Sequence, residues 1–181
     1  MIIETSNLTK KYSNKVTALN NVSLSIDTGI FGLLGRNGSG KTTLMRILTT
    51  LIEPTGGTAS ILGMDVTPAN KTQIKRSIGY LPQEFGFYKE FTVSEIMEYI
   101  CIMRDFDKKT IGETLEKVNL YNERKKKYKE LSGGMKRRVG LAQAILGNPP
   151  VLIVDEPTVG VDPEELSLIH ISEPTRHLRI S

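Results

Sequence analysis

The sequence has a single cysteine and two histidines among its 181 residues. Because Cys101 has no second cysteine to pair with, a disulfide-stapled secreted domain is excluded, and a reducing compartment is favoured. The residues around Cys101 are mostly apolar, which predicts a small buried side chain; a reactive thiol is the alternative.

Long apolar runs are also missing. No stretch approaches the roughly 20 apolar residues that a membrane-spanning helix needs. The first 15 residues are polar and lack the apolar core of a signal peptide. We therefore expect a chain that does not cross a membrane itself, and attachment to a membrane partner stays open.

There is little excess charge of either sign. The formal net charge is +4, which suits an anionic ligand but is too weak to indicate nucleic acid. The composition, with 39% apolar and 24% charged residues, is ordinary for a globular protein. The length fits one domain with its own hydrophobic core.

Hydrophobic patterning predicts an α/β domain. Alternating residues in 1–28 indicate antiparallel strands with turns near Ser13 and Asp27. Apolar runs predict further strands at 30–34, 58–62, 78–81 and 151–154. Helical periodicity and capping signals predict helices at 41–51, 92–103, 111–118 and 132–146. Strands that alternate with helices imply a mostly parallel sheet.

A glycine-rich loop joins the run at 30–34 to the helix expected at 41–51, and it matches the pattern G-x-x-x-x-G-K-[ST] in full. Its residues are Gly35, Arg36, Asn37, Gly38, Ser39, Gly40, Lys41 and Thr42. Glycines let backbone N–H groups point at phosphate oxygens, and the helix start adds unpaired donors. Lys41 supplies a cation for the β- and γ-phosphates, and Thr42 supplies a hydroxyl for Mg²⁺. This P-loop predicts a nucleoside triphosphate site.

Two acidic residues follow the strand expected at 151–154. Asp155 and Glu156 stand at the end of a parallel strand, where such sheets bind ligands, and the segment resembles a Walker B motif. Asp155 is expected to hold Mg²⁺, and Glu156 is expected to polarise the attacking water as general base. Together with the P-loop, this pair predicts an NTPase.

A second glycine-rich helix start, Leu131–Met135, narrows the class. Ser132, Gly133 and Gly134 form another potential anion site. One nucleotide does not need two such sites on one chain, so the second serves the γ-phosphate of a nucleotide held by a partner. The segment LSGGM resembles the signature motif of ATP-binding-cassette (ABC) ATPases, and its place between P-loop and Walker B is the order found in that family.

The resemblance implies further site residues. Tyr12 matches the aromatic residue that stacks on adenine, and Gln83 matches the Q-loop glutamine that contacts Mg²⁺ and links the site to the transport partner. Asp162 matches the D-loop aspartate that shapes the site across a dimer, although Val161 stands where leucine is usual. Thr43 is assigned to the nucleotide site with them. The implied catalytic residues are Glu156, Gln83 and Lys41, and the implied metal-binding residues are Thr42, Gln83 and Asp155.

The resemblance also implies a fold and partners. The fold is α/β of the P-loop NTPase type, with an antiparallel β subdomain at the N-terminus and a helical signature subdomain at about 84–146, within a nucleotide-binding domain of 1–165. Two such subunits, identical or paralogous, close head to tail around two ATP molecules. An integral-membrane permease contacts residues 84–103 and holds the subunit at the inner, cytoplasmic face of the membrane; no nucleic acid is expected.

Four aromatic residues lie in the loop after Gln83: Phe85, Phe87, Tyr88 and Phe91. They suit a partner-binding patch and the hydrophobic core equally well. The highly charged segment 122–130 is expected to be a solvated surface. Residues 32–66 resemble subunits that serve bacterial ABC-2-type exporters, which favours export.

The end of the chain departs from the family. A complete subunit continues for a few dozen residues after the D-loop and adds a strand and a switch histidine. Neither His170 nor His177 follows an apolar strand in that position. Residues 166–181 are similar to translated sequencing-adapter tails, so we expect a non-native tail; an unusual native C-terminus is the alternative. We expect this chain to bind nucleotide and to hydrolyse it poorly.

Two other functions compete with the transporter subunit. The first is a soluble ABC ATPase acting on DNA or ribosomes. DNA-repair relatives insert a coiled coil between Gln83 and Leu131, where only about 50 positions lie here, and ribosome-directed relatives carry two cassettes. The basic runs 125–127 and 136–138 lack interleaved aromatic platforms, apart from Tyr128. The second is a truncated fragment that binds ATP without turnover.

Overall fold

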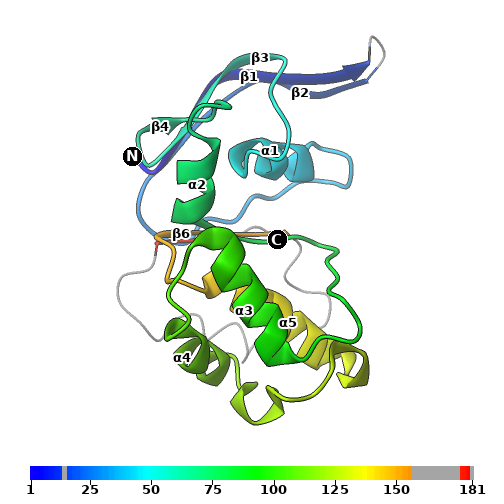
Figure 1. Cartoon of the computed structure of the whole chain (residues 1–181). Helices are drawn as coiled ribbons and strands as arrows, with labels where there is room; N and C mark the ends of the chain where they lie inside the picture. The colour runs from blue at the N-terminus through cyan, green and yellow to red at the C-terminus, as the bar shows by residue number, and fades with distance from the viewer. Residues whose placement is uncertain (14–15, 156–175, 180–181) are drawn as a thin grey trace.

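The computed structural model describes residues 1–13, 16–155 and 176–179. In Figure 1 an antiparallel sheet lies at the top, helices α1 (Lys41–Leu48) and α2 (Lys71–Ser77) lie beneath it, and a parallel sheet separates them from three further helices. These are α3 (Val93–Arg104), α4 (Thr110–Lys117) and α5 (Gly133–Ile145). The expected α/β fold, with antiparallel N-terminal strands and a helical part, is confirmed.

The antiparallel sheet has the strand order β2-β1-β3-β4. Its strands are β1 (Ile3–Ser13), β2 (Val16–Ile26), β3 (Gly56–Ile61) and β4 (Met64–Asp65). Ile3 pairs with Ile26 on one side and with Ile61 on the other, so β1 is central. The side chains of Ile3, Thr5 and Leu8 in β1 are buried in the interior. The residues between them face solvent and are polar. β1 ends at Ser13, where the sequence predicts a turn.

The parallel sheet joins distant parts of the chain in the order β5-β6-β7. Its strands are β5 (Ile78–Leu81), β6 (Val151–Val154) and β7 (Arg176–Arg179). All four residues of β6 are buried, because successive side chains point to opposite faces and both faces are covered. Val151 and Ile153 join the hydrophobic core that contains α1, while Leu152 and Val154 join the core built by α3, α4 and α5. β6 therefore separates two cores.

The strand expected at 30–34 is wrong. These residues form no strand and have no place in the sheet order β5-β6-β7. Phe31 and Leu33 pack against the core around α1, whereas Ile30 and Leu34 are 48% and 82% exposed. An apolar run does not distinguish burial on one face from burial on two.

The helices follow local signals closely, with one omission. α3 begins after Thr92, whose side chain accepts from the Glu95 N–H while Glu95 accepts from the Thr92 N–H, as the capping-box pattern predicts. Ser132 caps α5 in the same way by accepting from the Met135 N–H. Helix α2 is not predicted by the sequence, because Ile74 is its only buried residue and leaves no helical periodicity to detect.

The segment between β5 and α5 answers two questions that the sequence left open. Phe85 and Phe87 pack against the core, whereas Tyr88 and Phe91 are exposed. The four aromatics are therefore divided between core and surface. The charged segment forms two 3-10 turns, η1 (Tyr121–Glu123) and η2 (Tyr128–Glu130), and it is mostly exposed, with Tyr128 buried against Phe87.

Two further expectations concern Cys101 and the end of the chain. Cys101 is buried, as predicted, and burial raises the pKa of its thiol. β7 falls inside the segment predicted to be a non-native tail, and its backbone belongs to the parallel sheet. The assignment of 166–181 as non-native stays a prediction, as does the domain boundary at 165. Within the described residues, no helix has the length and apolar character to cross a bilayer.

Candidate nucleotide-binding site

The P-loop has a backbone that only glycine accommodates at two positions. Gly38 and Gly40 have φ values of +83° and +94°, in the left-handed region that side chains disfavour. A methyl group on Gly40 would also overlap the backbone oxygen of Ala18 in β2. The loop is therefore held against the antiparallel sheet just before α1 begins.

Lys41 folds back over this loop. Its Nζ donates to the backbone oxygens of Gly35, at 2.5 Å, and Arg36, at 3.3 Å. α1 has no side-chain cap and no acidic residue in its first turn, in contrast to α3 with its capping box. A lysine cation and unpaired N–H donors thus face one exposed loop, in which Asn37 and Ser39 also lie. This cradle fits a triphosphate.

Tyr12 reaches the same helix start from β1. Its hydroxyl lies 3.3 Å from the Thr43 Oγ1, and the side chain is 52% exposed. The ammonium of Lys10 lies 5.6 Å from the centre of the ring. The structure therefore places an accessible aromatic surface beside Thr43 and the P-loop, where a nucleotide base bound next to the phosphates would meet it.

Asp155 lies at the carboxyl end of β6. It is 2% exposed, and its N–H donates to the Leu81 oxygen at 2.9 Å, which puts it next to the segment that follows β5. Burial and the charge of Asp155 raise the pKa of the Tyr80 hydroxyl, while Arg46 of α1 lowers it. Tyr80 of β5 packs against the core that contains α1, in a position that sequence reasoning did not single out.

The residues present fit a Mg²⁺ ion. Mg²⁺ in phosphate sites takes one or two carboxylates together with phosphate oxygens and water. Asp155 carries a carboxylate, Thr42 at the start of α1 carries a hydroxyl, and Gln83 is exposed one residue beyond Pro82, so these three side chains have the chemistry that would suit such an ion. No group of three or more His, Cys, Asp or Glu residues gathers anywhere in the described ranges, so no all-protein cage for a metal exists there. Glu156 and Asp162 lie outside the described residues.

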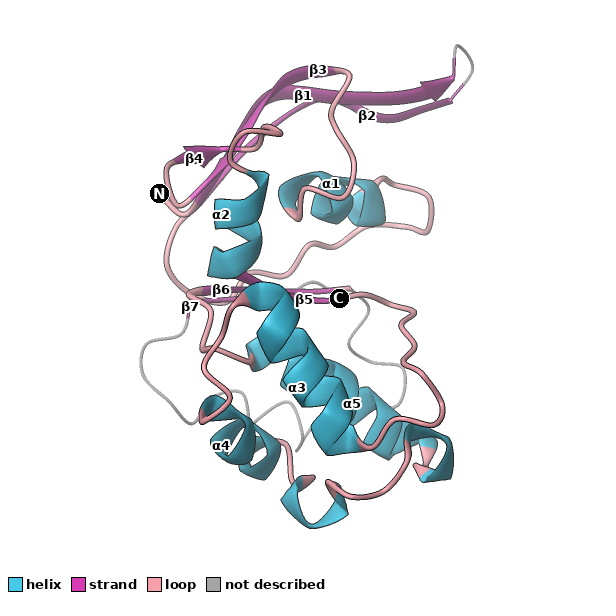
Figure 2. Ribbon diagram, viewed as in Figure 1, coloured by secondary structure: helices cyan, strands magenta, loops and turns pink. Residues whose placement is uncertain are grey.

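The signature segment stands at the start of α5, in the helical layer on the other side of the parallel sheet from α1. In Figure 2, α5 starts below the parallel sheet, whereas the loop before α1 lies above it. A Cβ added at Gly133 or Gly134 meets no atom within 4 Å, and the first turn of α5 carries no acidic residue. Ser132, Gly133 and Gly134 thus present an open helix start that the P-loop of the same chain does not face.

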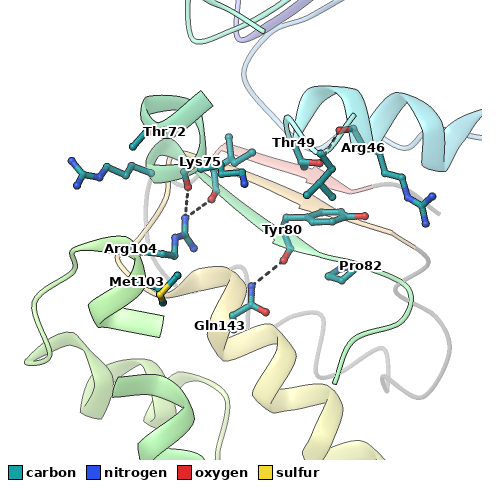
Figure 3. A pocket seen from close by; sticks show the side chains of 12 residues that line it. Arg46, Thr49, Thr72, Lys75, Tyr80, Pro82, Met103, Arg104 and Gln143 are labelled. Carbon is teal, nitrogen blue, oxygen red and sulfur yellow. Dashed lines mark hydrogen bonds between the residues drawn. The ribbon is translucent and has the colours of Figure 1, made fainter. Parts of the chain in front are cut away.

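Two cavities, of about 620 and 590 Å³, share Met103 and Gln143 as lining residues; the first lies between the α1–α2 layer and α3, and the second lies against α3 and the segment before it. We call them together the groove. Figure 3 shows the first cavity, into which Tyr80 and Arg46 project from one side and Met103 and Arg104 from the other. No single stretch of sequence predicts the groove, because α1, α2, β5, α3 and α5 all contribute to it.

The groove has a basic half and an apolar half. The basic half contains Arg46, Lys75 and Arg76, together with Arg104, which donates to the backbone oxygens of Lys75 and Ile78. The apolar half is lined by Phe87, Tyr88, Phe91, Ile96, Tyr99, Ile100 and Met103. Such a surface suits a partner segment that is itself apolar on one side and acidic on the other.

The basic run 136–138 is only partly exposed. Arg137 is 8% exposed and directs its guanidinium toward the backbone of Pro82 and Gln83. Lys136 is half-buried, with its ammonium over the Tyr128 ring. Arg137 therefore has a position in the interior, and the absence of a nucleic-acid partner stays a prediction.

Comparison with known proteins decides the family. The profile described as "ABC transporter" matches residues 19–159, which contain the P-loop, the signature segment and Asp155. The chain belongs to the ABC transporter family. The resemblance inferred from the LSGGM segment is confirmed.

The similar curated ABC proteins include transporters named for both directions. The bacitracin transport ATP-binding protein BcrA of Bacillus licheniformis is 40% identical, covering 99% of this chain and 60% of BcrA. The Nod factor export ATP-binding protein I of Burkholderia orbicola is 37% identical, covering 92% and 56%. The methionine import ATP-binding protein MetN of Bifidobacterium longum is 39% identical, covering 84% and 40%. The chain thus spans about half the length of these relatives.

Solved ABC cassettes share the fold. The dimeric structure of MJ0796, a bacterial ABC transporter cassette, superposes with a TM-score of 0.85 at 28% identity and covers 99% of this chain and 88% of that one. The layers, the P-loop helix and the signature helix therefore follow the architecture of a known nucleotide-binding cassette.

Proposed function

We propose that this chain is the nucleotide-binding part of an ABC transporter subunit that binds MgATP and hydrolyses it to drive transport. The observation that carries the proposal is the cradle at α1. Lys41 folds over a glycine-rich backbone that can bind an anion, Tyr12 lies beside Thr43, and the buried Asp155 stands at the end of β6. Family membership supports the same conclusion.

Each side chain has a chemical task in this proposal. The P-loop backbone and Lys41 bind the phosphates, and Tyr12 stacks on the base. Thr42, Gln83 and Asp155 orient the Mg²⁺, which when bound neutralises developing charge on the phosphates. Glu156 accepts a proton from the attacking water as general base. Donors and cations held in fixed positions stabilise the charge that develops on the transferring phosphate, and this is the main source of catalysis in phosphoryl transfer.

A second nucleotide-binding subunit completes the site. The start of α5 is open and free of acidic residues, yet it lies in the layer opposite the P-loop. Two chains placed head to tail bring Ser132, Gly133 and Gly134 of each onto the γ-phosphate bound by the other. Asp162 shapes the shared boundary between the two chains. The two chains close when ATP binds and separate after hydrolysis, and this motion drives transport.

An integral-membrane permease is the proposed partner at the groove. Tyr88, Tyr99 and Met103 are 71%, 51% and 67% exposed there, which is unusual for large apolar side chains without a partner. The segment 84–103, assigned to this contact from the family resemblance, supplies most of the apolar half. Such docking would hold the subunit at the inner face of the cell membrane.

Export is the proposed direction. It rests on the likeness of residues 32–66 to subunits that serve ABC-2-type exporters, and a relative named for Nod factor export agrees. A nucleic-acid-directed ATPase is not favoured, because Arg137 is buried and the described helical part contains no long coiled coil between Gln83 and Leu131.

The proposal is tested through Lys41. We expect Lys41→Ala to weaken binding of a fluorescent ATP analogue about tenfold or more, since a charge-assisted hydrogen bond is lost. Lys125→Ala, at an exposed lysine of the charged segment, is the matched control and should bind like the wild type. Equal binding by Lys41→Ala and the wild type would show that the cradle does not hold the nucleotide.

A further inference from the structure

Helix α5 carries a buried guanidinium about one turn after its first residue. Arg137 is 8% exposed, and its Nη1 donates to the Gln83 oxygen at 3.3 Å and lies 3.5 Å from the Pro82 oxygen. A buried charge is costly unless it is paired and hydrogen-bonded. Through these contacts, Arg137 restrains the backbone of Pro82 and Gln83.

Phe85 completes the attachment of this segment to α5. The Arg137 guanidinium lies 5.6 Å from the centre of the Phe85 ring. On the next turn of the helix, a methyl group at Gly140 would overlap the same ring. Arg137 and Gly140 therefore hold the chain on both sides of Gln83, at its backbone and at the aromatic residue two positions later.

Asp155 is joined to the same segment from the end of β6. Its N–H donates to the Leu81 oxygen at 2.9 Å, two residues before Gln83. Arg137 thus contacts the backbone of Gln83, and Asp155 is bonded to the strand end that leads to Gln83. Gln83 and Asp155 are two of the three residues that we assign to Mg²⁺.

We propose that Arg137 is a positioning residue that couples the signature helix to the Mg²⁺ side of the nucleotide site. It stands about 6 Å along the axis from the first residue of α5, within one helix. When Ser132 and Gly134 meet the nucleotide of a partner chain, any shift of α5 moves Arg137, and with it the backbone of Gln83. The inference rests on the proposed MgATP site and adds a residue that links its two halves.

The test compares nucleotide affinity with and without Mg²⁺. The full chain and its Arg137→Met variant are titrated with a fluorescent ATP analogue, once with excess Mg²⁺ and once with EDTA. We expect equal affinity in EDTA, because the P-loop does not contact Arg137. The gain in affinity that Mg²⁺ gives the wild type should fall about tenfold in the variant.

Lys136→Met is the matched control. Lys136 precedes Arg137 on the same helix, and its ammonium also lies 5.6 Å from an aromatic ring, that of Tyr128. It has no contact with Gln83 or Asp155 among the interactions of the described residues, so the Mg²⁺ gain should be retained. Arg137→Lys keeps the charge but not the planar fork, and it should restore part of the gain.

The outcomes separate the inference from the proposed function. If wild-type chain shows no MgATP binding, both fail. If it binds with a Mg²⁺ gain that Arg137→Met retains, the inference alone is overturned. If Arg137→Met does not fold, as judged by circular dichroism, Arg137→Lys decides: a full wild-type gain overturns the inference, and a reduced gain supports it.

Discussion

At the scale of single residues, the Tyr12 side chain has two parts with different contacts, the hydroxyl and the ring. Its hydroxyl contacts Thr43, whereas its exposed ring is proposed to stack on the base. We expect Tyr12→Ala to weaken ATP binding about tenfold, because stacking of a base on an aromatic ring contributes roughly 1–3 kcal/mol. Tyr12→Phe should bind like the wild type. Isothermal titration of both variants checks this, and equal losses would assign the effect to the hydroxyl.

Residue by residue, the sequence locates chemistry that is local and misses chemistry that depends on distant contacts. The P-loop and Asp155 follow apolar runs directly, and Ser132 stands at its own helix start, so pattern alone finds them. Arg137 and Tyr80 become relevant only when β5 meets α5 and β6. The residue pattern within β5 or within α5 does not indicate that these elements come into contact. Glu156 and Asp162 stay predictions, outside the described residues.

At the scale of elements, the start of α3 offers a test of the capping box. We expect Thr92→Ala to lower the free energy of unfolding by about 1 kcal/mol, because the Glu95 N–H loses its acceptor. Urea denaturation monitored by circular dichroism measures the change. Thr110→Ala, at the start of α4 where no side-chain cap is present, is the control and should cost less. An equal cost in both variants would contradict the capping role.

The same box has a defined dependence on pH. Hydrogen bonds from the Thr92 backbone and side chain lower the pKa of Glu95 below its ordinary value. A carboxylate with a lowered pKa stabilises the fold above its ordinary pKa and loses that contribution as pH falls through the lowered one. The difference between wild type and Thr92→Ala should therefore shrink in acid.

Elements also show where sequence patterns stop being informative. The helices α3 and α5 and the strands β5 and β6 carry dense apolar residues between clear caps or breakers, and they form where expected. The run 30–34 is equally apolar but gains no strand partner, since partners are a property of the sheet and not of the run. α2 has one buried side chain and therefore gives no signal at all.

At the scale of the whole molecule, the proposed head-to-tail dimer predicts a charge effect at the start of α5. Gly134→Asp places a carboxylate where a partner's γ-phosphate would lie, and we expect ATP-dependent dimerisation to weaken tenfold or more. Light scattering with MgATP measures it, with nucleotide binding followed in parallel. Asn122→Asp adds the same charge at an exposed site and should dimerise normally. A dimer unaffected by Gly134→Asp would exclude this arrangement.

The proposed permease contact predicts that one face of α3 matters and the other does not. Met103 and Ile102 are both 67% exposed, but only Met103 lines the groove. We expect Met103→Glu to reduce binding to membranes of the native cell about tenfold, while Ile102→Glu binds like the wild type. Co-sedimentation measures both, with protein-free liposomes as the blank. Equal losses would show that α3 contributes only general hydrophobicity.

The pairing of β5 with β6 has a consequence for how the protein is made. β5 is synthesised early, but its hydrogen-bonded neighbour follows only after residues 82–150, which carry α3, α4 and α5. Until β6 leaves the ribosome, the core around α1 lacks Val151 and Ile153, and the edge of β5 is unpaired. Nascent chains that stop short of β6 should therefore be sensitive to protease and should recruit chaperones, and chains that extend beyond it should resist both.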